Sequence, residues 1–158
     1  MKTSIELEQL INLEKYKHVE VSEHILRDLL SACLLIAHEY IALPEIEGIA
    51  IGGSLGRAFV DGKSDIEMYV YYTGDLPSRE VLQEIIGHKL GAVLTRSDDV
   101  HRYHPARGYH SFFRVKDTNV ELGYRNLAGI KDKIVAFQEK LLLPKHGIHD
   151  TPFGHYPS

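Results

Sequence analysis

The chain is poor in the features that mark secreted and membrane proteins. Among its 158 residues there is one cysteine, Cys33, so no disulfide can form within the chain. The longest apolar stretch runs only from 29 to 37, whereas a helix needs about 20 apolar residues to cross a bilayer. The N-terminal sequence turns acidic soon after Lys2, unlike a secretory signal. We therefore expect a cytoplasmic protein that has no membrane partner.

Basic residues are also in short supply, since 18 of them face 22 acidic ones and give a net charge of −4. A protein that binds nucleic acid normally presents a basic face, so this balance argues against a nucleic-acid partner. Glycine and proline, at 13 and 6 residues, are too few to indicate disorder. The length suits a single domain with a hydrophobic core.

What the chain does have is a pair of carboxylates in the segment GGSLGRAFVDGKSDIEMYV, residues 52–70. The run from Asp65 to Tyr72 is rich in strand-forming residues, and alternate residues of a strand point to the same face. Asp65 and Glu67 should therefore stand side by side, while Ile66, Met68 and Val70 face a core. Two adjacent acids repel each other unless a cation lies between them, and oxygen ligands of this kind suit Mg²⁺ with a nucleotide's phosphates.

A glycine turn precedes this strand. The apolar run that ends at Ile51 is typical of a strand, and it leads directly into Gly52, Gly53 and Ser54. A strand that breaks at glycines and restarts as a short helix presents backbone N–H groups to an anion, and Ser54 and Arg57 can add donors. The segment is not a Walker loop, because no Gly-Lys-Ser/Thr follows, and it lacks the G-x-G-x-x-G spacing of a dinucleotide site.

A third carboxylate, Glu121, lies in the alternating segment 119–125, where Val120, Leu122 and Tyr124 share the other face. The preceding segment 110–116 is also strand-like, and the residues between the two favour a tight turn. Glu121 is therefore a candidate third ligand on a strand beside the carboxylate pair. The alternative for all three acids is a solvated face of the sheet, where charged residues usually lie.

These residues resemble those of a known family. GSLGR, Asp61-Gly62 and SDIEM together are similar to the nucleotide-binding segment of the kanamycin (aminoglycoside) nucleotidyltransferases, members of the DNA polymerase β-like nucleotidyltransferase superfamily. The close match covers about twenty residues. Many members carry a second glycine where this chain has Ala58, and most have aspartate where it has Glu67.

The resemblance implies an α+β nucleotidyltransferase fold, with a small mixed sheet flanked by helices on one side. It implies transfer of a nucleoside monophosphate from a Mg²⁺-bound nucleoside triphosphate, with ATP as the expected nucleotide, to a hydroxyl of a small molecule such as an aminoglycoside. Asp65, Glu67 and Glu121 would be the catalytic and metal-binding residues. The nucleotide would contact a set of four residues: Gly53, Ser54, Arg57 and Ser64.

The same resemblance bears on domains and partners. We expect a helical extension at 1–21, the nucleotidyltransferase domain at 22–145, and an irregular tail or the start of a helical domain at 146–158. The resembling enzymes complete their acceptor pocket with a helical C-terminal domain, so a further segment or a second protomer should complete it here. A homodimer would meet that need.

Two other functions stay open. Toxin-like members of the superfamily modify a protein or an RNA, and nucleotide-site motifs do not determine the acceptor. A nucleotide-sensing module without turnover is the third hypothesis, although it has no need to keep three mutually repelling acids.

Periodicity and capping residues predict the remaining elements. Helices are expected at 4–18, from a Ser22 cap to about Leu43, at about 79–90 after Ser78, and at about 127–142. A short strand is expected at 92–96 and a polar loop at 97–109. The buried stripe of the Ser22 helix should comprise Ile25, Leu26, Leu29, Leu30, Cys33, Ile36, Ala37, Tyr40 and Ile41.

Three histidines, His101, His104 and His110, lie in or beside this loop. Their spacing is not that of a standard zinc site, and no cysteine or acid completes one. The loop can be read as a metal site, as a surface that faces a substrate or another protomer, or as an ordinary loop.

Overall fold

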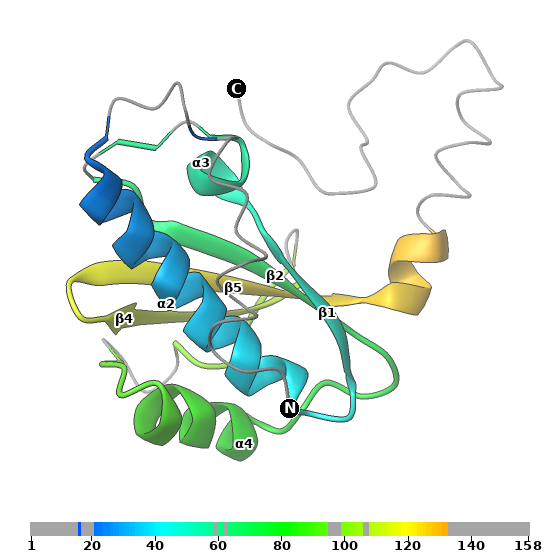
Figure 1. The fold of residues 1–158 in the computed structure, drawn as a ribbon. Coiled ribbons are helices and arrows are strands. Elements are labelled where there is room, and N and C mark those ends of the chain that lie inside the picture. The colour runs from blue at the N-terminus through cyan, green and yellow to red at the C-terminus, as the bar shows by residue number, and fades with distance from the viewer. Residues whose placement is uncertain are drawn as a thin grey trace, which may run out of the picture.

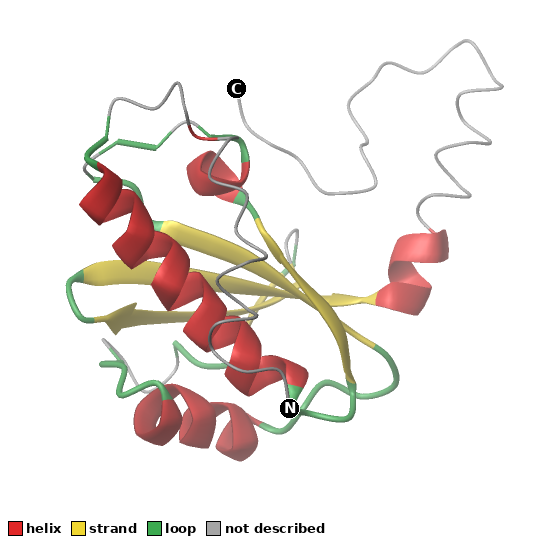
Figure 2. Ribbon diagram, viewed as in Figure 1, coloured by secondary structure: helices red, strands yellow, loops and turns green. Residues whose placement is uncertain are grey.

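The computed structural model describes residues 16, 21–58, 60–61, 63–94, 99–105 and 108–132. It is an α+β structure built on one five-stranded mixed sheet (Figures 1 and 2). The helix expected at 4–18, the tail at 146–158 and most of the helix expected at 127–142 lie outside the described residues, although 127–132 are helical. The five strands are β1 (Ile46–Ile51), β2 (Ile66–Tyr72), β3 (Arg102–His104), β4 (Gly108–Val115) and β5 (Thr118–Asn126).

The strand order in the sheet is β1-β2-β5-β4-β3. Strand β2 pairs antiparallel with β1 and parallel with β5, and β4 pairs antiparallel with both β5 and β3. A parallel pair needs a crossover connection, and here the chain between β2 and β5 supplies a helix and two further strands. The two strands that were expected to carry the carboxylates are therefore neighbours, as the sequence predicted.

Helix α2 (Glu23–Ile41) begins at the predicted cap, where the Ser22 hydroxyl accepts a hydrogen bond from the N–H of Ile25. Its buried positions recur at helical spacing and confirm most of the predicted stripe. The exceptions are Ile25 and Ile41, which are 39% and 51% exposed, and Ala37, which is partly buried against the core. The buried residues are Leu26, Leu29, Leu30, Cys33, Ile36 and Tyr40.

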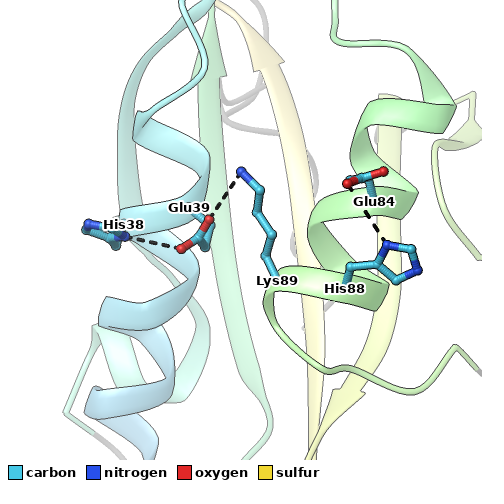
Figure 3. Close-up of polar contacts among 5 residues, drawn as sticks. All are labelled: His38, Glu39, Glu84, His88 and Lys89. Carbon is cyan, nitrogen blue, oxygen red and sulfur yellow. Dashed lines mark hydrogen bonds and ion pairs between the residues drawn. The ribbon is translucent and has the colours of Figure 1, made fainter.

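Helix α4 (Arg79–Glu84) begins at the predicted Ser78 cap and continues as a π-helical turn, η2 (Ile85–Lys89). It lies on the same side of the sheet as α2 (Figure 1). Figure 3 shows the link between these two segments, in which Nζ of Lys89 is 3.5 Å from Oε2 of Glu39 on α2. His88, by contrast, lies beside Glu84 of its own helix and is 81% exposed.

The chain after η2 differs from the prediction. Gly91 adopts a left-handed backbone, φ 58°, and within 92–94, the described part of the strand expected at 92–96, only Val93 makes a bridge, to Arg114 of β4. The predicted loop contains a strand, β3, which pairs with the start of β4. Its three residues are all exposed, so they have none of the hydrophobic alternation by which a strand is recognised in a sequence.

The core lies between the helices and one face of the sheet. Ile66, Met68 and Val70 of β2 are buried as predicted, and they alternate with partly exposed residues. A polar chain crosses this core, because the hydroxyl of Tyr124 is 3.0 Å from that of Tyr40 and 2.8 Å from that of Ser111. No helix among the described residues combines the length and apolar character needed to span a membrane.

Candidate functional site

Two of the predicted acidic residues face each other across the parallel strand pair. Glu67 of β2 and Glu121 of β5 are Cα partners in the register, so their Cα atoms are separated by about one strand spacing, roughly 4.8 Å. Both alternate with buried residues, which places their side chains on the face of the sheet opposite the core. Two carboxylates at this separation repel each other and attract cations and hydrogen-bond donors.

Asp65 lies at the start of the same face. It directly precedes β2 rather than belonging to the strand, and it is exposed. Nδ2 of Asn119, on β5, donates a hydrogen bond of 3.2 Å to Oδ1 of Asp65. The amide therefore ties the first predicted ligand to the strand that carries the third.

Glu121 has a buried neighbour, His110 of β4. Nδ1 of His110 lies 2.8 Å from Oε1 of Glu121, and the side chains are 5% and 28% exposed. The approach does not satisfy hydrogen-bond geometry at Nδ1, so we describe the contact by its distance, as an ion-pair contact. The imidazole also stacks on Phe112, with the ring centroids 6.0 Å apart and the planes 9° from parallel.

The predicted glycine turn lies directly over this face. Gly52 donates its N–H to the backbone carbonyl of Glu67 at 2.8 Å, and α3 (Gly53–Gly56) follows at once. Gly53 is buried with φ 54°, and a Cβ added there would lie 2.7 Å from Cδ of Glu67. A side chain at this position would collide with the carboxylate, so the close approach of the turn to Glu67 requires glycine.

The other predicted nucleotide contacts lie around this turn. Ser54 is half-buried in α3, and the exposed Arg57 ends it. Ala58, where the resembling family often has glycine, adopts φ 60°, a left-handed conformation that favours glycine. The chain thus keeps the backbone shape of a glycine at that position.

Ser64 instead belongs to the loop that leads into β2. Its hydroxyl accepts a hydrogen bond from the N–H of Asp61 and donates one to Oδ1 of the same residue. The N–H of Lys63 and this hydroxyl hold the pKa of the Asp61 carboxyl below its usual range. These bonds fix the loop that delivers Asp65 to the site.

The three predicted metal ligands do not form a ready cluster. Over the described residues, no three histidine, cysteine, aspartate or glutamate side chains are grouped so that they could hold a metal ion. Mg²⁺ does not require such a group, since it is commonly held by one or two carboxylates together with waters and substrate phosphates. The hard oxygen donors of Asp65 and Glu67 suit that mode of binding, and metal binding here stays a prediction.

Two residues of this site escaped the sequence analysis in their present roles. His110 was grouped with His101 and His104 as part of one loop, but it is buried in β4 beside Glu121, whereas His101 contacts the ring of Tyr109 with centroids 4.5 Å apart. Asn119 was predicted only as the first residue of the strand segment 119–125, where the turn ends. The register of β4 and β5 determines both contacts, and a single sequence carries no signal for that register.

Comparison with known proteins adds no assignment, because no family model, curated protein or solved structure is found to match the chain.

Proposed function

We propose that the chain is a nucleotidyltransferase that moves a nucleoside monophosphate from a Mg²⁺-bound nucleoside triphosphate to a hydroxyl of a small molecule. The observation that carries the proposal is the meeting of the two sequence features. The glycine turn packs so closely on Glu67 that a side chain at Gly53 would displace the carboxylate, and Glu121 stands in register beside it. A loop that can approach phosphates and a pair of opposed carboxylates are the parts that this reaction requires.

In the proposed reaction the acceptor oxygen attacks the α-phosphorus and the bond to the β-phosphate oxygen breaks. Pyrophosphate leaves with the electron pair, and the hydroxyl proton passes to a base. When bound, Mg²⁺ would screen the phosphate charge and stabilise the leaving group. Asp65 and Glu67 would hold the metal, and Glu121 would complete its ligands or orient the acceptor hydroxyl.

The phosphate end of the nucleotide would lie on the turn. The first N–H groups of a helix have no partners within that helix, and in α3 these belong to Gly53, Ser54 and the residue that follows. The Ser54 hydroxyl and the Arg57 guanidinium would add donors to the β- and γ-phosphates. The net charge of −4 favours a cationic acceptor of the aminoglycoside type.

The test is Mg²⁺-dependent release of pyrophosphate from ATP and GTP in the presence of a panel of aminoglycosides and lincosamides. Release with one drug class would identify the acceptor. Transfer of labelled nucleotide to a protein or RNA, in place of a drug, would assign the toxin-like activity. Absence of both Mg²⁺·nucleotide binding and turnover would refute the proposal.

Asp65→Asn and Glu67→Gln should stay folded and lose activity by roughly 10³-fold. Each substitution removes a negative charge that would hold the metal, and the metal would stabilise the phosphates by several kcal/mol. Asp28→Asn is the matched control, because Asp28 is an exposed carboxylate on α2 whose Oδ2 lies 3.0 Å from Nδ1 of His24. Circular dichroism and the thermal midpoint establish folding. Near-normal turnover by either site variant would contradict the assignment.

A further inference from the structure

The structure points to His110 as a positioning residue for Glu121, an inference that rests on the proposed function and adds a residue to its site. His110 lies on the same face of the sheet as Glu121, because its partner across the β4–β5 pair, Gly123, is two residues from Glu121, but its side chain is only 5% exposed. Its Nδ1 lies 2.8 Å from Oε1 of Glu121, which retains 28% exposure. The glutamate is therefore the member of the pair that can meet a ligand, and the imidazole is the member that can fix its orientation.

The sheet register makes this contact possible. Across the β4–β5 pair the partner of Glu121 is Phe112, and the partner of His110 is Gly123. Gly123 contributes no side chain here, and the Arg125 guanidinium and the Tyr69 ring lie over it. The imidazole therefore meets Glu121 along the diagonal of the strand pair. The Phe112 ring lies nearly parallel to the imidazole. The ring is thus held by packing as well as by the acid.

Chemistry indicates what the contact does. A carboxylate oxygen is only an acceptor, so a contact of 2.8 Å with Nδ1 is attractive when that nitrogen carries a hydrogen. An N–H group this close to Oε1, although off the hydrogen-bond direction, stabilises negative charge on that oxygen. It also offsets the repulsion between Glu67 and Glu121, which are in register on adjacent strands. Carboxylates that ligate metals are commonly held by outer partners of this kind, whose loss costs about 10–100-fold in metal affinity or activity.

The first experiment needs no substitution. Nitrogen-detected NMR of the histidines in the wild-type chain, assigned with a His110→Asn variant, reports which ring nitrogen carries the proton. We expect Nδ1 of His110 to be protonated. An imidazole protonated at Nε2 alone would overturn the inference, because Nδ1 could then not donate to Glu121.

The second experiment measures binding of Mn²⁺ by electron paramagnetic resonance in the presence of α,β-methylene-ATP, which cannot be cleaved at the reacting bond. His110→Leu should weaken Mn²⁺ binding by roughly 10–100-fold. His110→Asn should restore most of the affinity, because its amide N–H occupies the place of Nδ1. His88→Asn is the matched control, since His88 is 81% exposed and faces Glu84 on the helical layer.

The outcomes separate the two proposals. If the wild-type chain binds no Mn²⁺ with the analogue, the nucleotidyltransferase proposal fails, and the inference fails with it. If it binds and His110→Leu has the same affinity, only the role of His110 is refuted. A lowered thermal midpoint with unchanged Mn²⁺ affinity would likewise show that His110 serves packing alone.

Discussion

At the scale of single residues, the site depends on the absence of one Cβ. Gly53 and Gly74 share a left-handed backbone, at φ 54° and 69°, yet only Gly53 is crowded. A Cβ at Gly53 would lie 2.7 Å from Cδ of Glu67, whereas a Cβ at Gly74 would have no heavy atom within 4 Å. The two glycines therefore separate the cost of backbone strain from the cost of displacing the carboxylate.

Gly53→Ala and Gly74→Ala should both lose about 1–2 kcal/mol of stability through strain, measured by urea unfolding. Gly53→Ala should lose more than Gly74→Ala and should also fail to bind Mn²⁺ with the ATP analogue, because Glu67 must move. Gly74→Ala should bind normally. Equal stability losses and equal binding by the two variants would show that the turn does not constrain Glu67.

At the scale of elements, α2 carries a cap whose contribution can be isolated. The Ser22 hydroxyl accepts from the N–H of Ile25, 3.4 Å away, whereas Ser31 is exposed in the middle of the same helix. Ser22→Ala should cost about 1 kcal/mol of unfolding free energy, because an N–H at the helix start loses its partner. Ser31→Ala should instead add a few tenths of a kcal/mol, since alanine is the better helix former.

Denaturant unfolding of the two variants checks this pair of opposite signs. A Ser22→Ala variant as stable as the wild type would mean that water replaces the hydroxyl without loss.

The elements also show how far a single sequence leads. Strands β2 and β5 and helix α2 were predicted because their apolar residues recur with clear periods of two and 3.6, and Ser22 and Ser78 mark helix starts. Strand β3 was missed because three exposed residues have no period. The π-helical turn has no sequence signature of its own, so 79–90 read as one regular helix.

For the site, the sequence indicated that Glu67 and Glu121 each lie on the strand face opposite the apolar residues, and the structure adds that they stand in register. Burial alternation is local and can be read from neighbours along the chain. The contacts of Asp65 with Asn119 and of Glu121 with His110 arise between strands, so they depend on a register that one sequence does not specify.

At the scale of the whole molecule, the buried ionisable groups predict alkaline sensitivity. Burial raises the pKa of the Cys33 thiol to about 12 and that of the Tyr124 hydroxyl to about 12. The unfolded chain loses these protons at about pH 8.5–10, near the ordinary values, while the folded chain retains them. Between the pKa values of the unfolded chain and the folded values of about 12, the unfolded state binds fewer protons, so the free energy of unfolding falls as pH rises.

Urea unfolding at pH 8, 9, 10 and 11 should show this loss, with a slope of up to about 1.4 kcal/mol per pH unit for each group. Below about pH 8 neither group should contribute to the slope, because both states keep the proton. Cys33→Ala and Tyr124→Phe should each flatten the decline, whatever their effect on stability at neutral pH. A pH-independent stability up to pH 11 would mean that both groups ionise alike in the folded and unfolded chains.

The parallel pairing of β2 with β5 has a consequence for the time at which the site comes into being. Asp65 and its partner Asn119 are 54 residues apart in the chain, and the helix α4 with its π-helical turn and the strands β3 and β4 lie between them. The conformational entropy of closing so long a loop is lost before the contacts between β2 and β5 can form, which slows folding. On a ribosome, the segment through β2 emerges before β5, which follows it in the chain. Throughout that interval the nascent chain has Asp65 and Glu67 but lacks the strand that brings Glu121 beside them.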